Sequence, residues 1–281
     1  MGVWVIIVLG IVQGASEFLP ISSSGHLVMF YNIFKITDNT ILLSVILHAA
    51  TLLAVVFCYR QELWQLIKNP FCQTNKKLIA ATIPTCVIAL LFKNMVEKTF
   101  SGDFIIAGFI ITAVVLIISQ LIESKHNKTI QKEILSQNKN FLAKTKNITN
   151  INISYKQALL IGVSQGVAIF PGVSRSGSTI ATGLISGVKK QDAADFSFLL
   201  SIPIIIAGLV FEMFDVLQGN AVLNISWFNL SIGFLFSFVS GLVCIKLMLK
   251  FVKNKKLTWF SLYLFLLAVF LILNRYVLFL F

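Results

Sequence analysis

The feature that most constrains this chain is a series of apolar stretches that recur along its whole length, each near 18 residues or longer. About 20 apolar residues in a helix cross a hydrocarbon core of about 30 Å. Charged residues make up only 12% of the chain, whereas a soluble domain carries about 25%. The sequence therefore predicts an all-α integral membrane protein that crosses the lipid bilayer several times.

Six stretches have the length and composition of full transmembrane helices: 41–58, 78–92, 104–122, 193–214, 228–249 and 259–280. Two further apolar segments, 1–34 and 156–187, are broken in the middle by Gly, Pro and Ser. Polar backbone at membrane depth is tolerated only where protein or a water-filled cavity covers it. Each broken segment is therefore interpreted as a re-entrant helix hairpin that enters and leaves on one face. Two extra full spans apiece are less consistent with the sequence, because each arm has only about 14–20 residues.

The two broken segments resemble each other. GIVQGASEFLPISSSGH, residues 10–26, aligns without a gap on GVSQGVAIFPGVSRSGS, residues 162–178, with identical residues at seven of 17 positions. This predicts a single membrane domain, residues 1–281, made of two repeats of one hairpin and three spans, at about 1–122 and 156–281. Since three spans change sides and a hairpin does not, the repeat has inverted topology.

The positive charges test this topology. The net charge is +12, but the Lys and Arg residues lie in short loops between apolar segments, so they indicate membrane orientation and not a nucleic-acid partner. The inverted topology places 17 Lys and Arg on one face and three on the other. The positive-inside rule makes the first face cytoplasmic. The polar linker 123–155, which belongs to that face, is expected to be a solvated cytoplasmic connector.

Inverted hairpins bring their tips together near the bilayer midplane. Arg175 is the only basic residue placed that deep, and it needs an anionic partner, either Glu17 or a bound ligand. The other polar residues expected at the tips are Gln13, Ser22, Ser23, Ser24, His26, Ser174, Ser176, Ser178 and Thr179.

The residue types suggest a division of roles between the tips. A guanidinium matches phosphate oxygens, and Ser and Thr hydroxyls and N–H groups at a helix start also donate to phosphate. The second tip is thus a candidate anion cradle. The first tip carries a carboxylate and an imidazole, which serve proton transfer, metal binding or nucleophilic attack. Close helix packing is the competing interpretation for each Ser taken singly, and a structural ion pair is the competing interpretation for Glu17 and Arg175. His48, inside the span 41–58, is a weaker site candidate.

QGASEFLPISSSGH and PGVSRSGST resemble the two signature motifs of the undecaprenyl-diphosphate phosphatases, the bacitracin-resistance family of bacterial inner-membrane proteins. The resemblance covers the whole chain and both motifs in order. It implies hydrolysis of undecaprenyl diphosphate to undecaprenyl phosphate and inorganic phosphate, which recycles the lipid carrier for peptidoglycan synthesis. It also implies a divalent cation, Mg²⁺ or Ca²⁺, and an active site that opens to the outer, periplasmic side of the membrane.

The resemblance also implies residue roles. Glu17 with Gln13 is expected to bind the cation or to orient the nucleophile, and Gln13 stands where many family members have a second Glu. His26 is expected to act as acid/base or as the nucleophile, with Ser23 as the competing nucleophile. The residues expected to hold the diphosphate are Arg175, Ser22, Ser174, Ser176 and Thr179.

An alternative function is a transporter or flippase of a lipid phosphate or another anion, because inverted repeats and broken helices are typical of transporters. The Glu17, Ser23 and His26 set argues against transport alone, which needs no such chemistry. The expected partners are the polyprenyl diphosphate and the lipid bilayer. The sequence leaves the oligomeric state open, with a homodimer as one candidate.

Overall fold

The computed structural model describes residues 2–36, 40–99, 102–137, 148–215, 225–254 and 256–278. These residues form helices and connecting turns, with no strand among them. The α-helices are α1 (Val3–Phe18), α2 (Ser23–Ile33), α3 (Thr40–Cys58), α4 (Arg60–Lys68), α5 (Gln73–Lys98), α6 (Gly102–Gln137), α7 (Tyr155–Val167), α8 (Arg175–Ile185), α9 (Lys190–Asp215), α10 (Trp227–Asn254) and α11 (Thr258–Leu273). A 3₁₀ turn, η1 (Ile148–Asn150), precedes α7, and a π-helical turn, η3 (Asn274–Leu278), follows α11.

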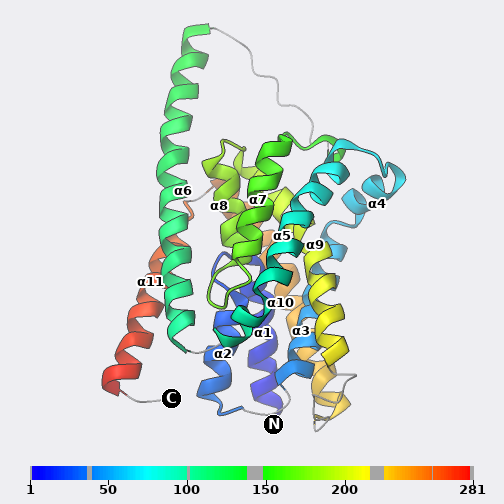
Figure 1. The fold of residues 1–281 in the computed structure, drawn as a ribbon, viewed down its shortest axis with the longest axis vertical. Helices are drawn as coiled ribbons and strands as arrows, with labels where there is room; N and C mark the ends of the chain where they lie inside the picture. Colours follow the sequence, from blue (N-terminus) through cyan, green and yellow to red (C-terminus); the bar gives the residue numbers. More distant parts are fainter. Residues whose placement is uncertain are drawn as a thin grey trace.

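Among the described residues, six helices are long and apolar enough to cross a membrane, which confirms the six predicted spans. The apolar segments are Ile41–Cys58, Gln73–Val96, Phe104–Lys125, Lys190–Phe214, Trp227–Val252 and Thr258–Tyr276. The largest difference from the predicted bounds is in α5, because the polar residues that begin this helix hid its first turns from the apolar pattern. The start of α1 and the end of α11 lie at the same end of the molecule (Figure 1), as six crossings require.

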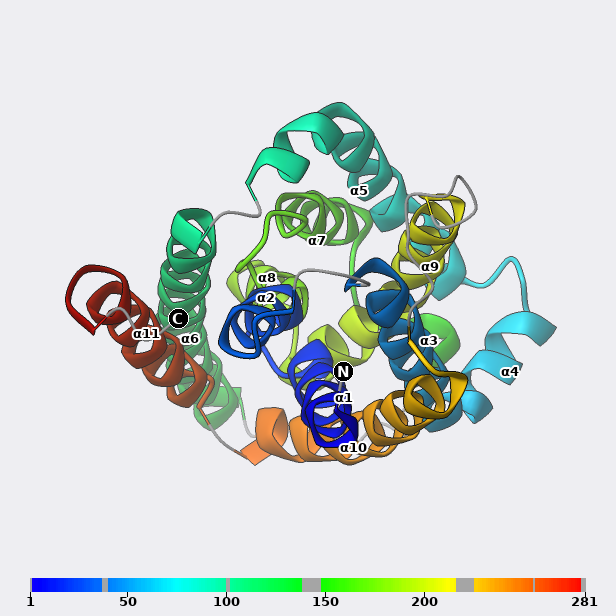
Figure 2. The same ribbon diagram turned by 90° about the horizontal axis from the view of Figure 1, so that it is seen from below.

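The two broken segments form two helix pairs, α1 with α2 and α7 with α8. The start of α1 and the end of α2 lie at the lower end of Figure 1, whereas the start of α7 and the end of α8 lie at its upper end. Viewed from below, α2 and α8 lie near the middle and the six long helices surround them (Figure 2). Two turns that come from opposite ends of the molecule therefore meet inside it.

Each helix pair packs on the other half of the chain. α1 packs chiefly against α10, and α7 packs chiefly against α5. Glycines allow these close approaches, because a Cβ on Gly10 would lie 2.7 Å from the carbonyl oxygen of Gly233, and a Cβ on Gly162 would lie 2.1 Å from that of Ala81. Gly10 and Gly162 are 152 positions apart in the sequence, and so are Ala81 and Gly233. The contacts thus repeat with the sequence.

The linker is partly structured. α6 continues past its apolar segment to Gln137, so the first part of the linker 123–155 is helical. Its end is anchored to α5, because Thr74 donates to the carbonyl of Ile148 at 2.8 Å and Lys77 donates to that of Ile151 at 3.1 Å. The residues between, 138–147, lie outside the described part of the chain.

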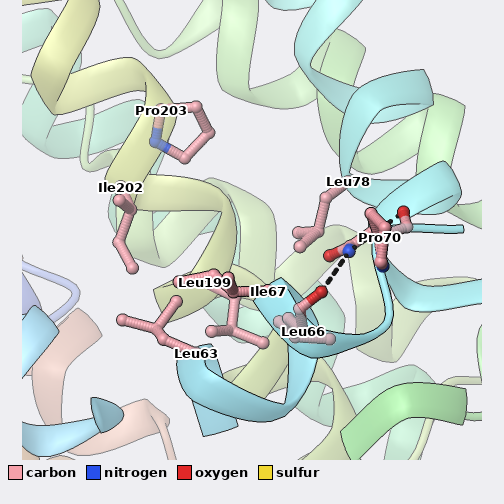
Figure 3. A pocket seen from close by; sticks show the side chains of 9 residues that line it. Leu63, Leu66, Ile67, Pro70, Leu78, Leu199, Ile202 and Pro203 are labelled. Atoms are coloured by element: carbon pink, nitrogen blue, oxygen red, sulfur yellow. Dashed lines mark hydrogen bonds between the residues drawn. The ribbon is translucent and has the colours of Figure 1, made fainter. Parts of the chain in front are cut away.

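An apolar groove lies between α4, α5 and α9 (Figure 3), with a volume of about 400 Å³. Its lining residues are Leu63, Leu66, Ile67, Pro70, Asn75, Leu78, Leu199, Ile202 and Pro203. Asn75 stabilises its rim by donating to the Leu66 carbonyl at 2.9 Å. None of the polar tip residues lines this groove, so it is separate from the site described next.

Candidate active site

The first turn is shaped by Pro20. A proline disfavours helical geometry in the residue before it, and Leu19 accordingly has an extended backbone with ψ of 146°, which ends α1. The chain then reverses through Ser22, which has φ of 70°, a strained value for a residue other than glycine. The Ser22 hydroxyl accepts from Gly25 N at 3.3 Å and caps α2.

The second turn is held against α6. Gly172 has φ of +85°, and a Cβ there would lie 2.4 Å from the carbonyl oxygen of Ile105, so only glycine fits this position. Ser174 caps α8 by accepting from Gly177 N at 3.0 Å, and its own N–H donates to the Thr112 hydroxyl at 2.9 Å. These contacts fix where α8 begins.

Glu17 joins the two turns. Its Oε1 accepts from Nη2 of Arg175, and its Oε2 accepts from the Ser23 hydroxyl at 2.6 Å and from Gln13 Nε2 at 3.0 Å. The Ser176 hydroxyl adds a second link between the turns by donating to the Leu19 carbonyl at 3.0 Å. The predicted convergence of Glu17, Gln13, Ser23 and Arg175 is therefore present in the structure.

Two polar atoms of this cluster are buried without a hydrogen-bond partner: Nη1 of Arg175 and Oε1 of Gln13. An unsatisfied buried donor or acceptor costs about 1–3 kcal/mol. Such groups point to a ligand that supplies the missing bonds. Nη1 of Arg175 is a cationic donor, which an anionic ligand group would satisfy. Oε1 of Gln13 is a neutral acceptor, which a cation would satisfy.

His26 lies apart from this cluster. Its Nδ1 donates to the Ser22 carbonyl at 2.7 Å, which leaves Nε2 of the neutral ring to accept from the Tyr263 hydroxyl at 2.7 Å. The ring also stacks on that of Tyr263, with centroids 5.7 Å apart. Because both ring nitrogens are occupied, His26 contacts neither Glu17 nor Ser23 through a hydrogen bond in the described chain.

Other predicted substrate-binding residues serve local structure. Ser22 and Ser174 are helix caps, and the Thr179 hydroxyl lies 2.6 Å from that of Ser197 on α9. Ser176 lies beside Ser174, with hydroxyl oxygens 3.3 Å apart. Ser22 thus fixes the start of α2, whereas Ser174, Ser176 and Thr179 position the start of α8, whose backbone N–H groups point toward the second turn.

His48 of α3 was a weak candidate in the sequence, and the structure places it beside Glu17, with Nε2 3.8 Å from Oε2. The only sequence signal for it is an imidazole inside an apolar span.

Comparisons with known proteins find relatives that match almost the whole chain. A family model described as the bacitracin resistance protein BacA matches residues 6–270. A protein of Carboxydothermus hydrogenoformans named undecaprenyl-diphosphatase is 38% identical over 265 residues, 94% of each chain. Undecaprenyl-diphosphatase 3 of Bacillus cereus is 36% identical over 96% of each chain, and the undecaprenyl-diphosphatase of Christiangramia forsetii is 32% identical over 98% of this chain and 99% of its own.

Proposed function

The chain belongs to the bacitracin resistance protein BacA family, and from that membership we propose that it hydrolyses undecaprenyl diphosphate to undecaprenyl phosphate and inorganic phosphate. The relatives that carry the name undecaprenyl-diphosphatase match it over almost the whole chain. The membrane-spanning helices place the enzyme where such a lipid is found. Resistance to bacitracin and recycling of the lipid carrier for cell-wall synthesis follow from this reaction.

The observation that carries the proposal is the junction of the two turns at Glu17 and Arg175. Arg175 holds the carboxylate with one nitrogen and keeps Nη1 buried without a hydrogen-bond partner. A diphosphate oxygen satisfies that donor, and the N–H groups at the start of α8 hold a second oxygen. The geometry thus supports the second turn as the diphosphate cradle, with Ser174 and Ser176 fixing its shape.

Ser23 is the nucleophile in this proposal. Its hydroxyl already donates to Glu17 at 2.6 Å, which is the arrangement of a nucleophile with its base. The diphosphate competes with Glu17 for Arg175 and leaves the carboxylate free to accept the Ser23 proton. Ser23 Oγ then attacks the terminal phosphorus, the bond to the bridging oxygen breaks, and undecaprenyl phosphate leaves. Water then attacks the phosphoserine, the Ser23 Oγ–phosphorus bond breaks, inorganic phosphate is released, and Glu17 returns the proton to Oγ.

His26 has a different role here from the one the sequence favoured. Its two hydrogen bonds, to the Ser22 carbonyl and to Tyr263, tie the strained turn to α11. Holding Ser22 at φ of 70° aims the next residue, Ser23, at Glu17. We therefore assign His26 as a positioning residue.

A divalent cation fits the first turn. Mg²⁺ and Ca²⁺ prefer oxygen ligands, and Mg²⁺ is commonly held by one or two carboxylates plus substrate phosphates. Glu17 supplies a carboxylate, and Gln13 supplies an amide oxygen that is buried without a partner. The described residues contain no group of three or more His, Cys, Asp and Glu side chains that could hold a metal, so the diphosphate would complete the coordination. The cation supplies charge neutralisation on the diphosphate.

The membrane arrangement that supports this reaction is an inverted-topology repeat with two re-entrant hairpins. The matched contacts of α1 on α10 and α7 on α5 support it, as do the opposite ends at which the two helix pairs enter (Figure 1). The excess of Lys and Arg at one face makes the linker 123–155 cytoplasmic. The hairpin α1–α2 then opens to the outer side of the bacterial inner membrane.

The test is release of phosphate from undecaprenyl diphosphate by the purified protein in detergent micelles. The wild-type chain should release inorganic phosphate, and Glu17→Ala should not. Lipid binding without release in the wild-type chain would instead favour the transporter alternative, which the inverted arrangement also suits.

A further inference from the structure

His48 extends the site to a third part of the chain. It lies on α3, outside both turns, and its side chain is 23% exposed. Its Nε2 faces Oε2 of Glu17, the same oxygen that accepts from Gln13 and Ser23. Side chains from α1, α2 and α3 thus converge on one carboxylate oxygen.

The hydrogen bond of Nδ1, the other ring nitrogen, determines whether Nε2 carries a proton in the neutral ring. Nδ1 of His48 lies 2.9 Å from the Ser44 carbonyl oxygen, which can only accept, so Nδ1 bears the proton. The Ser44 hydroxyl donates to Glu212 at 3.4 Å and lies 3.1 Å from Nδ1. In the neutral ring, Nε2 is therefore an unprotonated lone pair. A histidine that donates Nδ1–H to a backbone carbonyl while its Nε2 faces the site has the orientation of a metal ligand.

Two acceptor atoms, Nε2 of His48 and Oε2 of Glu17, then face each other at 3.8 Å. This is too long for a hydrogen bond, and two lone pairs do not attract. Two ligands of one cation with bonds of about 2.1 Å lie roughly 3–4 Å apart, which includes this separation. The amide of Gln13, 3.0 Å from the same carboxylate oxygen, has an Oε1 that is buried without a partner.

We propose that His48 is a ligand of the divalent cation, together with Glu17 and Gln13 Oε1. This deepens the proposed function, on which it rests for the diphosphate that completes the site. A mixed set of one imidazole nitrogen with carboxylate and amide oxygens suits a first-row transition-metal ion such as Mn²⁺ better than Ca²⁺, which takes oxygen ligands only. The chain should therefore bind Mn²⁺ in preference to Ca²⁺, in contrast to the Mg²⁺ or Ca²⁺ that the first motif alone suggests.

The test measures Mn²⁺ binding to the full-length protein in detergent, without substrate, by loss of the free Mn²⁺ signal in electron paramagnetic resonance. Ca²⁺ is then added as competitor. His48→Ala should weaken Mn²⁺ binding about tenfold or more and change Ca²⁺ binding much less. His48→Gln, which replaces nitrogen by oxygen at similar length, should lose the preference for Mn²⁺ and keep Ca²⁺ binding.

His126→Ala is the matched control, because it removes an imidazole in the linker segment, far along the sequence from either motif. It should bind Mn²⁺ as the wild-type chain does. Equal Mn²⁺ affinity in His48→Gln and wild type, with both eluting as the same monodisperse species, overturns the proposal. So does an imidazolium signature for His48 by NMR with no Mn²⁺ bound by the wild-type protein. Phosphate release by the wild-type chain would survive either result, so the proposed function is tested separately.

Discussion

Arg175 and Glu17 form an ion pair, and in the proposed reaction the same two side chains act on the diphosphate and on the nucleophile. Glu17 is buried and Arg175 is largely covered, with side-chain exposures of 5% and 16%, so each charge depends on the other until substrate arrives. Removing one partner of a buried pair leaves an uncompensated charge that costs about 3–5 kcal/mol. Stability and turnover must therefore be measured together in any variant of these two residues.

Arg175→Ala should lower phosphate release by about a thousandfold or more, because phosphoryl transfer relies on positioning and charge neutralisation. Arg175→Lys should recover only part of the rate, since an ammonium cannot hold Glu17 and a phosphate oxygen with two parallel bonds. The assay is phosphate release at saturating lipid, with thermal unfolding in parallel. Turnover near wild type in folded Arg175→Ala protein would contradict the assigned role.

Ser23→Ala should abolish turnover and leave no phosphorylated residue after an acid quench, as read by mass spectrometry. His26→Ala should slow the reaction yet still allow Ser23 to be phosphorylated, because the imidazole contacts the turn and not Glu17. Ser24→Ala is the matched control, since its hydroxyl contacts only Ser22, at 3.4 Å, among the residues of the site. A phosphohistidine at position 26 would reverse the assignment.

At the scale of helices, glycine determines how closely the elements approach. α7 lies so near α5 that a Cβ on Gly162 would overlap the backbone of Ala81. In contrast, a Cβ on Gly208 of α9 would meet no atom within 4 Å. Position 162 therefore has no room for a side chain, whereas position 208 does.

Gly162→Ala should destabilise the protein by about 1–3 kcal/mol, the cost of overpacking, and should lower its unfolding temperature in detergent. Gly208→Ala should leave that temperature unchanged or raise it, because alanine is the better helix former. Thermal unfolding followed by circular dichroism compares the two. Equal behaviour of both variants would show that the α5–α7 contact is looser than described.

The positions of the helices are largely predictable from the sequence, whereas contacts between individual residues are less so. The six spans follow from apolar length alone. The cost of a lone buried charge predicts an anionic partner for Arg175, either Glu17 or a ligand, and the structure shows Glu17 in contact with it. The contact of His26 with Tyr263, 237 positions away, depends on which helix lies beside which, and apolar periodicity carries no such information. His48 was underrated for the same reason, since only the packing of α3 beside α1 brings it to Glu17.

At the scale of the whole molecule, orientation can be tested directly. In a chain freed of its four cysteines, Lys35→Cys should react with a membrane-impermeant maleimide added outside intact cells. Lys68→Cys, at the end of α4, should react only after the membrane is opened. The proposed inverted repeat puts these two positions on opposite faces of the membrane. Labelling of both from outside would rule out the proposed orientation.

Each helix pair packs against a helix from the other half of the chain, and this has a consequence for folding during synthesis. α1 (Val3–Phe18) is synthesised long before its main partner, α10, which begins only at Trp227. The apolar helix pair α1–α2 therefore lacks its main packing partner while the chain between it and α10 is synthesised. Glu17, near the end of α1, acquires the surroundings described above only after α10 has been made, so a product truncated before Trp227 should be inactive.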